Sequence, residues 1–140
     1  MKVLIDTNII IDVLQQRQPW NVYGNKIFLA AACRQIDACI TAKESADIYF
    51  FAKKQLKGQE NADSKAREIM SKLFSLFEVI DTLGKDCHNA IAIDNGDYED
   101  AIMMASARRS GIGCIITRNT EHFKTEKIKI MTPKEFAERI

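Results

Sequence analysis

The sequence predicts an α/β protein in which helices cover both faces of a central, mostly parallel sheet of four to five strands. Short runs of apolar and β-branched residues alternate along the chain with longer segments of helical periodicity, the pattern that parallel strands with helical crossovers produce. The first run, over residues 2–5, is apolar almost throughout, as expected for a strand covered on both faces. These two observations indicate a three-layer α/β/α architecture.

Five short segments have the apolar content of strands. They cover residues 2–5, 37–40, 77–80, 114–117 and 129–131. The longer segments have the spacing of helices. They cover residues 8–16, 20–33, 41–57, 61–76, 84–94 and 97–110, with a last helix from residue 132. Because helices separate most of the expected strands, we predict that the strands run mostly parallel.

Several of the early helix boundaries are marked by single residues. Pro19 breaks the chain after the first helix and fits the first helical position of the next element. Thr41 and Glu44 match a capping box. The helix that they open is expected to run to about Lys57, just before Gly58.

The later boundaries follow the same rules. The helix of residues 97–110 is rich in small side chains, which allow it to approach the sheet closely, and it is expected to end before Gly111. Thr132 is a suitable cap for the last helix, and Pro133 fits its first turn.

Length and composition are those of one domain spanning residues 1–140. The net charge of +1 gives no global argument for nucleic acid, although Lys53-Lys54 and Arg108-Arg109 are local basic pairs. The four cysteines form no C-x-x-C pair, so we expect small buried thiols rather than disulfides or a zinc site. We expect a cytoplasmic protein without a membrane span, because no apolar run is long enough and no secretory signal is visible.

Asp6 stands where an α/β sheet builds its ligand site. It follows the first strand directly, and ligands of open α/β sheets bind beyond the carboxyl ends of the strands. Asp is also a favoured helix cap, which gives Asp6 a purely structural alternative. Thr7 and Asn8 are able to cap the same helix, and this weakens the structural explanation.

Two acids follow the second strand, and the residues alone leave their roles open. Glu44 stands three residues after the helix cap, where its side chain reaches back to the backbone. Asp47 lies inside the helix, with Phe50 and Phe51 three and four residues further along. A carboxylate beside an apolar face needs a partner, and either a bound cation or Lys43, one turn earlier, fits that need.

Asp97 and Asp100 begin the helix of residues 97–110. Asp97 suits the cap and Asp100 suits the first turn, near the positive end of the helix dipole, so structural and functional roles are equally well supported. In a parallel sheet, Asp6, Asp47 and Asp100 can all face the same edge. Carboxylates crowded in this way stay ionised around a cation or share protons, and oxygen ligands favour Mg²⁺ or Mn²⁺.

Four segments of the chain resemble motifs of the PIN-domain nucleases, and of the VapC-like toxin ribonucleases among them. In order and spacing they cover essentially the whole chain: residues 3–8, 40–50, 97–101 and 116–123. The resemblance implies a PIN-like fold and a Mg²⁺- or Mn²⁺-dependent endoribonuclease that hydrolyses RNA phosphodiester bonds. It also implies that the chain is the toxin of a type II toxin–antitoxin pair, with RNA and a cognate antitoxin protein as partners.

The resemblance also implies which side chains hold the metal ion. It makes Asp6 and Asp100 core carboxylates, and it places a further acid early in the helix after the second strand. Glu44 and Asp47 both compete for that position. We choose Asp47, because Glu44 already has a capping role and the Asp-Ile-Tyr pattern is similar to one branch of the family.

Asn119 departs from the family pattern, in which Asp is common at this position. Asn brings no charge, and Asp97, one helical turn from the core acid, is able to supply the missing carboxylate. By the resemblance, Asp97 or Asn119 orients water or the outer ligands. Arg118 is the best candidate for a phosphate contact, and Asn8 and Thr117 offer short polar side chains to the substrate.

Two other functions are consistent with the sequence. Asn119 motivates a catalytically weak PIN-like module that binds RNA or protein without cutting. Phosphoryl transfer through an aspartyl phosphate at Asp6 is the other, but position 8 is Asn where phosphatases of the haloacid-dehalogenase type carry a second carboxylate.

A partner surface is also expected. Trp20 and Tyr23 are candidates for an antitoxin interface or for the interface of the homodimer that we expect. Core packing explains these two aromatic side chains equally well.

Overall fold

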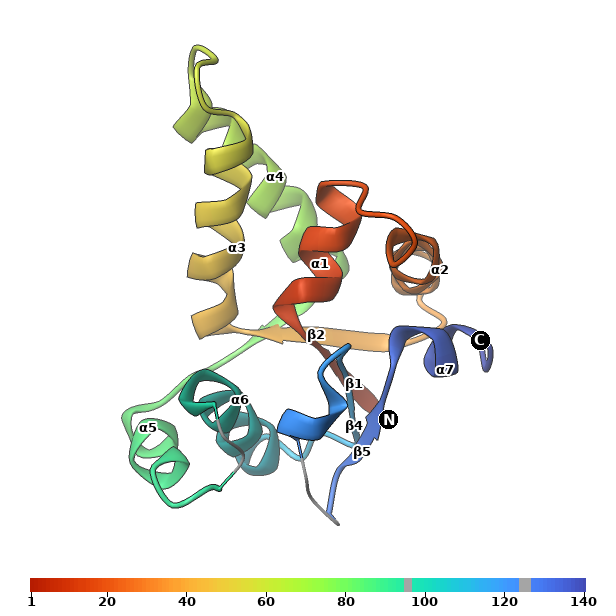
Figure 1. Cartoon of the computed structure of the whole chain (residues 1–140), viewed down its shortest axis with the longest axis vertical. Coiled ribbons are helices and arrows are strands. Elements are labelled where there is room, and N and C mark those ends of the chain that lie inside the picture. The colour runs from red at the N-terminus through yellow and green to blue at the C-terminus, as the bar shows by residue number, and fades with distance from the viewer. Residues whose placement is uncertain (95–96, 124–126) are drawn as a thin grey trace.

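The computed structural model describes residues 1–94, 97–123 and 127–140, and its centre is a five-stranded parallel sheet (Figure 1). The strands are β1 (Lys2–Ile5), β2 (Asp37–Thr41), β3 (Glu78–Ile80), β4 (Cys114–Ile116) and β5 (Lys129–Met131). Their order across the sheet is β3-β2-β1-β4-β5, and every neighbouring pair is parallel. The predicted strands and their mostly parallel arrangement are confirmed.

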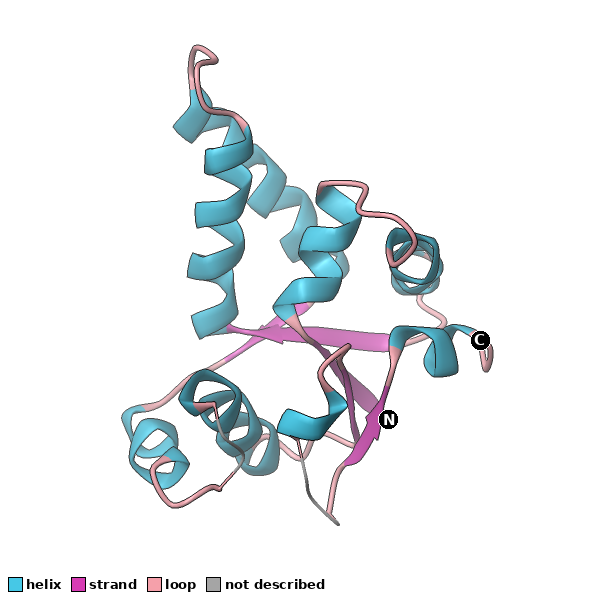
Figure 2. Cartoon of the chain, in the orientation of Figure 1, coloured by secondary structure: helices cyan, strands magenta, loops and turns pink. Residues whose placement is uncertain are grey.

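Helices cover both faces of this sheet, so the predicted three-layer α/β/α class is confirmed (Figure 2). Within the described residues they are α1 (Thr7–Leu14), α2 (Asn21–Ala32), α3 (Ala42–Gln55), α4 (Ala62–Leu76), α5 (Gly84–Ala90), α6 (Tyr98–Arg109) and α7 (Pro133–Ala137), with a short 3-10 helix, η1 (Thr120–His122). Helices α1 to α4 and α7 lie on one side of the sheet, and α5 and α6 lie on the other.

Strand β1 shows why its sequence is apolar at successive positions. Val3 and Ile5 pack into the cluster formed with α1 to α4 and α7, whereas Leu4 packs into the opposite cluster with Met103 and Met104 of α6. Both faces of the strand are therefore buried from Val3 to Ile5, and only Lys2, at its start, keeps a partly exposed side chain.

The ends of several helices differ from the prediction. Helix α1 begins at Thr7 and ends at Leu14, because Gln16 adopts a left-handed backbone with a φ of 51°. Helix α2 begins at Asn21 rather than at Trp20, α3 ends at Gln55, and α5 ends at Ala90, four residues early. Element ends are the least constrained part of a sequence pattern, and these shifts leave the topology unchanged.

The predicted capping box of α3 is confirmed. Thr41 Oγ1 accepts from the Glu44 N–H at 3.2 Å, and the Thr41 N–H donates to Glu44 Oε1 at 2.9 Å. The α3–α4 pair rises away from the sheet as a hairpin (Figure 1). One end of α3 is thus fixed at the edge of the sheet, and the rest of the helix projects from it.

All four cysteines are free thiols, as expected from their spacing. Cys39 and Cys114 are buried and Cys87 is partly buried, but Cys33 is exposed at the end of α2, contrary to the expectation for that residue. Among the described residues, no helix is long and apolar enough to cross a membrane.

Candidate active site

The carboxyl ends of the central strands open into a cleft of about 400 Å³. Because β1 lies between β2 and β4, the segments that follow these three strands meet at one edge of the sheet, and the start of α6 closes the cleft. Six of the eight predicted site residues line it: Asp6, Asn8, Asp47, Asp97, Asp100 and Asn119. A larger cavity, of about 840 Å³, lies at the opposite edge of the sheet and contains none of the predicted residues.

Asp6 is buried at the base of the cleft. Its backbone N–H still belongs to the sheet, donating to the Ile116 carbonyl at 3.0 Å, and its side chain accepts from Thr117 Oγ1 at 2.7 Å. Asp6 occupies the cap position of α1 but makes no capping hydrogen bond, so the structural alternative for this residue is not observed. Burial raises the pKa of the Asp6 carboxyl, and the hydrogen bond from Thr117 opposes that rise.

Glu44 combines the capping role with a position in the cleft. One oxygen, Oε1, completes the capping box, and the other, Oε2, accepts from Thr7 Oγ1 at 3.2 Å. The residue is only 1% exposed. Burial, and next the negative charge of Asp6, raise the pKa of Glu44 to about 8. Two buried carboxylates that repel each other are the arrangement that a divalent cation relieves.

Asp47 lines the same cleft, but it already has a cationic partner. Lys43 Nζ lies 2.5 Å from Asp47 Oδ2 and 3.4 Å from Glu99 Oε1. The Asp47 side chain is 39% exposed, whereas Glu44 is almost completely enclosed. The geometry therefore favours Glu44 over Asp47 as the acid that accompanies Asp6.

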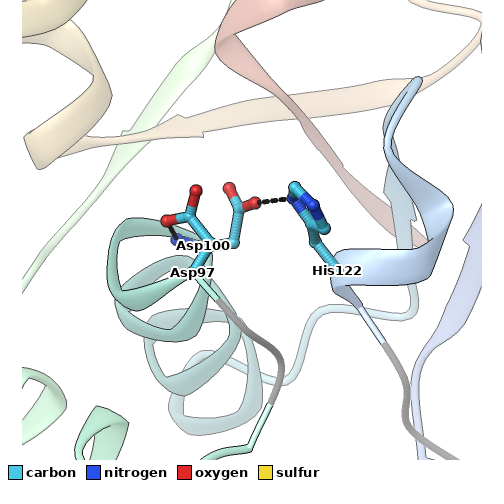
Figure 3. Close-up of side chains that lie close together, drawn as sticks. All are labelled: Asp97, Asp100 and His122. Carbon is cyan, nitrogen blue, oxygen red and sulfur yellow. Dashed lines mark hydrogen bonds and ion pairs between the residues drawn. The ribbon is translucent and has the colours of Figure 1, made fainter.

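Asp97, Asp100 and His122 form a cluster (Figure 3), of which Asp97 and Asp100 line the cleft. Asp97 caps α6 by accepting from the Glu99 and Asp100 N–H groups, as predicted for it. His122 Nδ1 lies 2.7 Å from Asp100 Oδ2. One ligand atom from each of the three side chains lies within 4.8 Å of the others, which is close enough to hold one metal ion.

The electrostatics of this cluster depend on burial. Burial is the main cause that raises the pKa of Asp100, to about 6, while its hydrogen bond with His122 acts in the opposite direction and the charge of Asp6 adds to the rise. The same hydrogen bond raises the pKa of His122. His122 was not among the predicted site residues, although it lies inside the last motif segment, because its approach to Asp100 spans 22 residues of sequence.

The family of the chain follows from its sequence profile. The profile described as PIN domain matches residues 2–121. The chain belongs to the PIN domain family. This confirms the family expected from the four motif segments, and the acids of the cleft now have the context of a PIN domain.

Relatives of this PIN domain match over nearly their full length. The chain is 23% identical over 143 residues to "Ribonuclease VapC1" of Aquifex aeolicus (strain VF5), covering 99% of this chain and 94% of that protein. Among solved structures, a toxin–antitoxin complex from Klebsiella pneumoniae aligns with a TM-score of 0.65 and 23% identity over 94% of this chain and 97% of the other. FitAcB from Neisseria gonorrhoeae aligns with a TM-score of 0.68 and 17% identity over 94% and 98%. At these identities the structures establish the fold.

Arg118 and Thr117 lie near the cleft of the PIN domain without lining it. Arg118 Nε is 2.9 Å from Asp12 Oδ2, and the guanidinium lies 4.3 Å from the centre of the Trp20 ring. The Arg118 guanidinium is therefore engaged with Asp12 of α1 and with Trp20 in the structure, and its contact with a substrate phosphate stays a prediction. Thr117 is fully buried beneath Asp6, where it positions that carboxylate instead of contacting a substrate. Asn119 does line the cleft, as predicted.

The donor set of this PIN domain fits a divalent metal ion. Asp6, Glu44 and Asp100 supply carboxylate oxygens, and burial is the first cause that raises the pKa of each. Such groups ionise readily only when a cation compensates them, and oxygen ligands are those that Mg²⁺ and Mn²⁺ prefer. PIN nucleases in general use a divalent metal ion. Among the described residues, Asp97, Asp100 and His122 bring ligand atoms within 4.8 Å of one another, and Asp6 and Glu44 line the same cleft as Asp97 and Asp100.

Proposed function

We propose that this PIN domain is a metal-dependent endoribonuclease, the toxin of a type II toxin–antitoxin pair. The observation that carries the proposal is the meeting of Asp6, Glu44 and Asp100 at the carboxyl edge of the sheet. The relative from Aquifex aeolicus, which bears the name ribonuclease, and the solved toxin–antitoxin complex support it. RNA and an antitoxin protein as partners, a homodimeric state and a cytoplasmic location belong to the same proposal.

Asp6, Glu44 and Asp100 are the residues that we assign to the metal ion, Mg²⁺ or Mn²⁺, with Glu44 in place of Asp47. A bound divalent ion supplies Lewis acidity toward the phosphate and lowers the pKa of water in the site. The donor set also extends toward Asp97, whose ligand atom lies within 4.8 Å of those of Asp100 and His122. A nitrogen ligand from His122 suits Mn²⁺ better than Mg²⁺.

Other side chains hold these acids in place. Thr117 fixes Asp6, and Thr41 and Thr7 each bind one oxygen of Glu44. Hydrogen-bonded partners of this kind orient metal ligands. Removing one commonly lowers the affinity for the ion by about 10- to 100-fold. Asn119 offers an uncharged amide at the rim of the cleft, where it is able to orient water.

Cleavage of RNA by purified protein tests the proposal. We expect Mn²⁺-stimulated cleavage of single-stranded RNA by the wild type and no cleavage by Asp6→Asn, with the fold of the variant unchanged by circular dichroism. Asp37→Asn is the matched control, because Asp37 is an exposed acid at the other end of the sheet. Unchanged cleavage by Asp6→Asn rejects the assignment.

Asn119 favours one alternative, a PIN-like module that binds RNA or protein without cutting it. The amide brings no charge to the cleft, so the cleft attracts a divalent ion less strongly than one with a further carboxylate would. Calorimetric titration with Mn²⁺ separates the two functions. Tight ion binding together with ion-dependent cleavage excludes the alternative, whereas RNA binding without cleavage at any Mn²⁺ concentration supports it.

A further inference from the structure

One face of helix α3 leads out of the acidic cleft along a row of four side chains. Lys43, Asp47, Phe50 and Lys54 follow one another at intervals of four, three and four residues, and such residues share one side of a helix. The row begins beside the carboxylates, where Lys43 and Asp47 form their ion pair. It continues up the part of α3 that rises from the sheet (Figure 1).

Phe50 is the unusual member of this row. It lines the cleft together with the acids, yet 61% of the residue is exposed. Phe51 lies beside it, with the ring centres 5.8 Å apart and an angle of 80° between the planes. This edge-to-face contact restricts the Phe50 ring without covering it, so an aromatic surface remains available at the wall of the cleft.

Lys54 follows Phe50 one turn further along the same face. Its side chain is exposed and forms no ion pair or hydrogen bond within the described part of the chain, in contrast to Lys43, which is paired with Asp47 and Glu99. Lys57, in the turn after the helix, is exposed and unpaired among the same residues. Positive charge therefore becomes available only beyond Phe50, on the side away from the acids.

The spacing along α3 matches a short length of polynucleotide. Glu44 and Phe50 are six residues apart, which is about 9 Å along a helix axis. Stacked nucleotides rise about 3.4 Å each along one strand, so this distance corresponds to about two to three nucleotides. A strand whose phosphate lies at the acids is therefore able to bring a neighbouring base to Phe50 and a further phosphate to Lys54.

We propose that Phe50 stacks on an unpaired base of the substrate and that Lys54 binds the phosphate backbone beyond it, so that the cleft selects single-stranded or splayed RNA. Base faces are accessible to an aromatic side chain only where the nucleotides are unpaired, and such stacking tolerates any base. The inference rests on the proposed ribonuclease function, because it takes the phosphate at the acids to be the scissile one.

Binding of a labelled RNA tests this inference separately from catalysis. The probe is a fluorescein-labelled, unstructured RNA of twelve nucleotides, about four times the length that spans the distance from Glu44 to Phe50. The protein carries Asp6→Asn so that it does not cut the RNA. Fluorescence anisotropy in Mn²⁺ should show Phe50→Ala binding the single strand about 5- to 150-fold more weakly, the effect of losing one stacked base. Phe50→Trp should restore the affinity, and Lys54→Gln should lower the slope of log K against log salt by about 0.7.

Phe74→Ala is the matched control, because Phe74 is a 47% exposed aromatic residue on the neighbouring helix α4 and does not line the acidic cleft. It should bind like the parent protein, and the same RNA annealed to its complement should bind the parent, Phe50→Ala and Phe74→Ala equally. Equal affinities of Phe50→Ala and Phe74→Ala for the single strand overturn the inference. So does equal weakening for single strand and duplex.

A second copy of the chain is the other occupant that this face allows. If sedimentation shows that Phe50→Ala dissociates a dimer while single-strand affinity is kept, Phe50 belongs to a protein interface and the inference is wrong. Failure of the proposed function has a different signature, since wild-type protein then leaves the RNA intact in Mn²⁺ whatever residue stands at position 50.

Discussion

Glu44→Gln separates the two roles that one side chain combines. In a capping box Gln replaces Glu at the third helical position, and its amide oxygen still accepts from the Thr41 N–H. The amide nitrogen is able to donate to Thr7 Oγ1 where Glu44 Oε2 now accepts. The substitution thus keeps the hydrogen bonds of Glu44 and removes its charge, which is the property that we assign to metal binding.

The size of the effect follows from the pKa of Glu44. Burial and the charge of Asp6 raise this pKa from 4.5 to about 8 in the folded protein. The folded state therefore holds its proton more tightly than the unfolded state, and the stability that this contributes is complete below pH 4.5 and is lost as the pH rises through about 8. At about 1.4 kcal/mol per pKa unit, the whole difference is on the order of 5 kcal/mol.

Urea unfolding at several pH values measures this effect. In EDTA, the free energy of unfolding of the wild type should fall by about 3 to 5 kcal/mol between about pH 5 and pH 8, and that of Glu44→Gln should fall by clearly less. At pH 8, Mn²⁺ should restore the stability of the wild type by mass action, because ions bind the folded state only. It should not change the stability of Glu44→Gln.

Asp47→Asn is the comparison that decides between the two acids. Asp47 is half exposed and paired with Lys43, so its loss should change stability by less than about 1 kcal/mol and leave the response to Mn²⁺ intact. The reasoning is refuted if Glu44→Gln keeps the pH dependence of the wild type. It is equally refuted if Asp47→Asn, and not Glu44→Gln, abolishes the stabilisation by Mn²⁺.

Three further predictions concern the surroundings of the cleft. His122→Ala should weaken Mn²⁺ binding about 10- to 100-fold in calorimetry, whether His122 binds the ion or orients its ligand. Arg118→Met should lower the free energy of unfolding in urea by at most about 3 to 5 kcal/mol, because the buried Asp12 then keeps only the more distant Arg17, 3.9 Å away, as a cationic partner, and it should leave the salt dependence of RNA binding unchanged. Burial raises the pKa of Asp86, but hydrogen bonds from Arg109, the Leu83 N–H and Ser106 lower it by a larger amount. The pKa of Asp86 therefore lies below its usual value of 3.8. The stability lost in Asp86→Asn should therefore be constant above about pH 4 and shrink as the pH falls below that value.

The fold was predictable because its buried strands are recognisable from their apolar residues. Each strand of a sheet covered on both faces must be apolar at successive positions, and residues 3–5 have that property. The order of the strands placed Asp6 and Asp100 at one edge by a general rule of α/β sheets. Helix ends were less predictable, since the stop of α1 depends on the left-handed backbone of Gln16, which no periodicity reveals.

The details of the site depend on tertiary contacts that the sequence does not encode locally. The sequence pattern presents capping and metal binding as alternative roles for Glu44, but in the structure its two oxygens face different partners. Arg118 was expected at a phosphate because it follows a strand at the site, and the structure turns it toward Asp12 on α1, 106 residues earlier. His122 reaches Asp100 across 22 residues, a contact that only the packing of η1 against α6 creates.

The charge of the chain bears on the proposed binding of RNA. With a net charge of +1, the protein lacks the overall excess of positive charge that many nucleic-acid-binding proteins have, and the acids of the cleft repel phosphate. Two unit charges 4 Å apart repel by about 4 kcal/mol at an effective dielectric constant of about 20, so a phosphate approaches these acids only when a divalent ion is present. Stacking on Phe50 is free of this constraint, because it involves no charge. Affinity built from one ion, one aromatic face and few unpaired lysines depends only weakly on salt, so the proposed mode of binding suits a PIN domain that is nearly neutral.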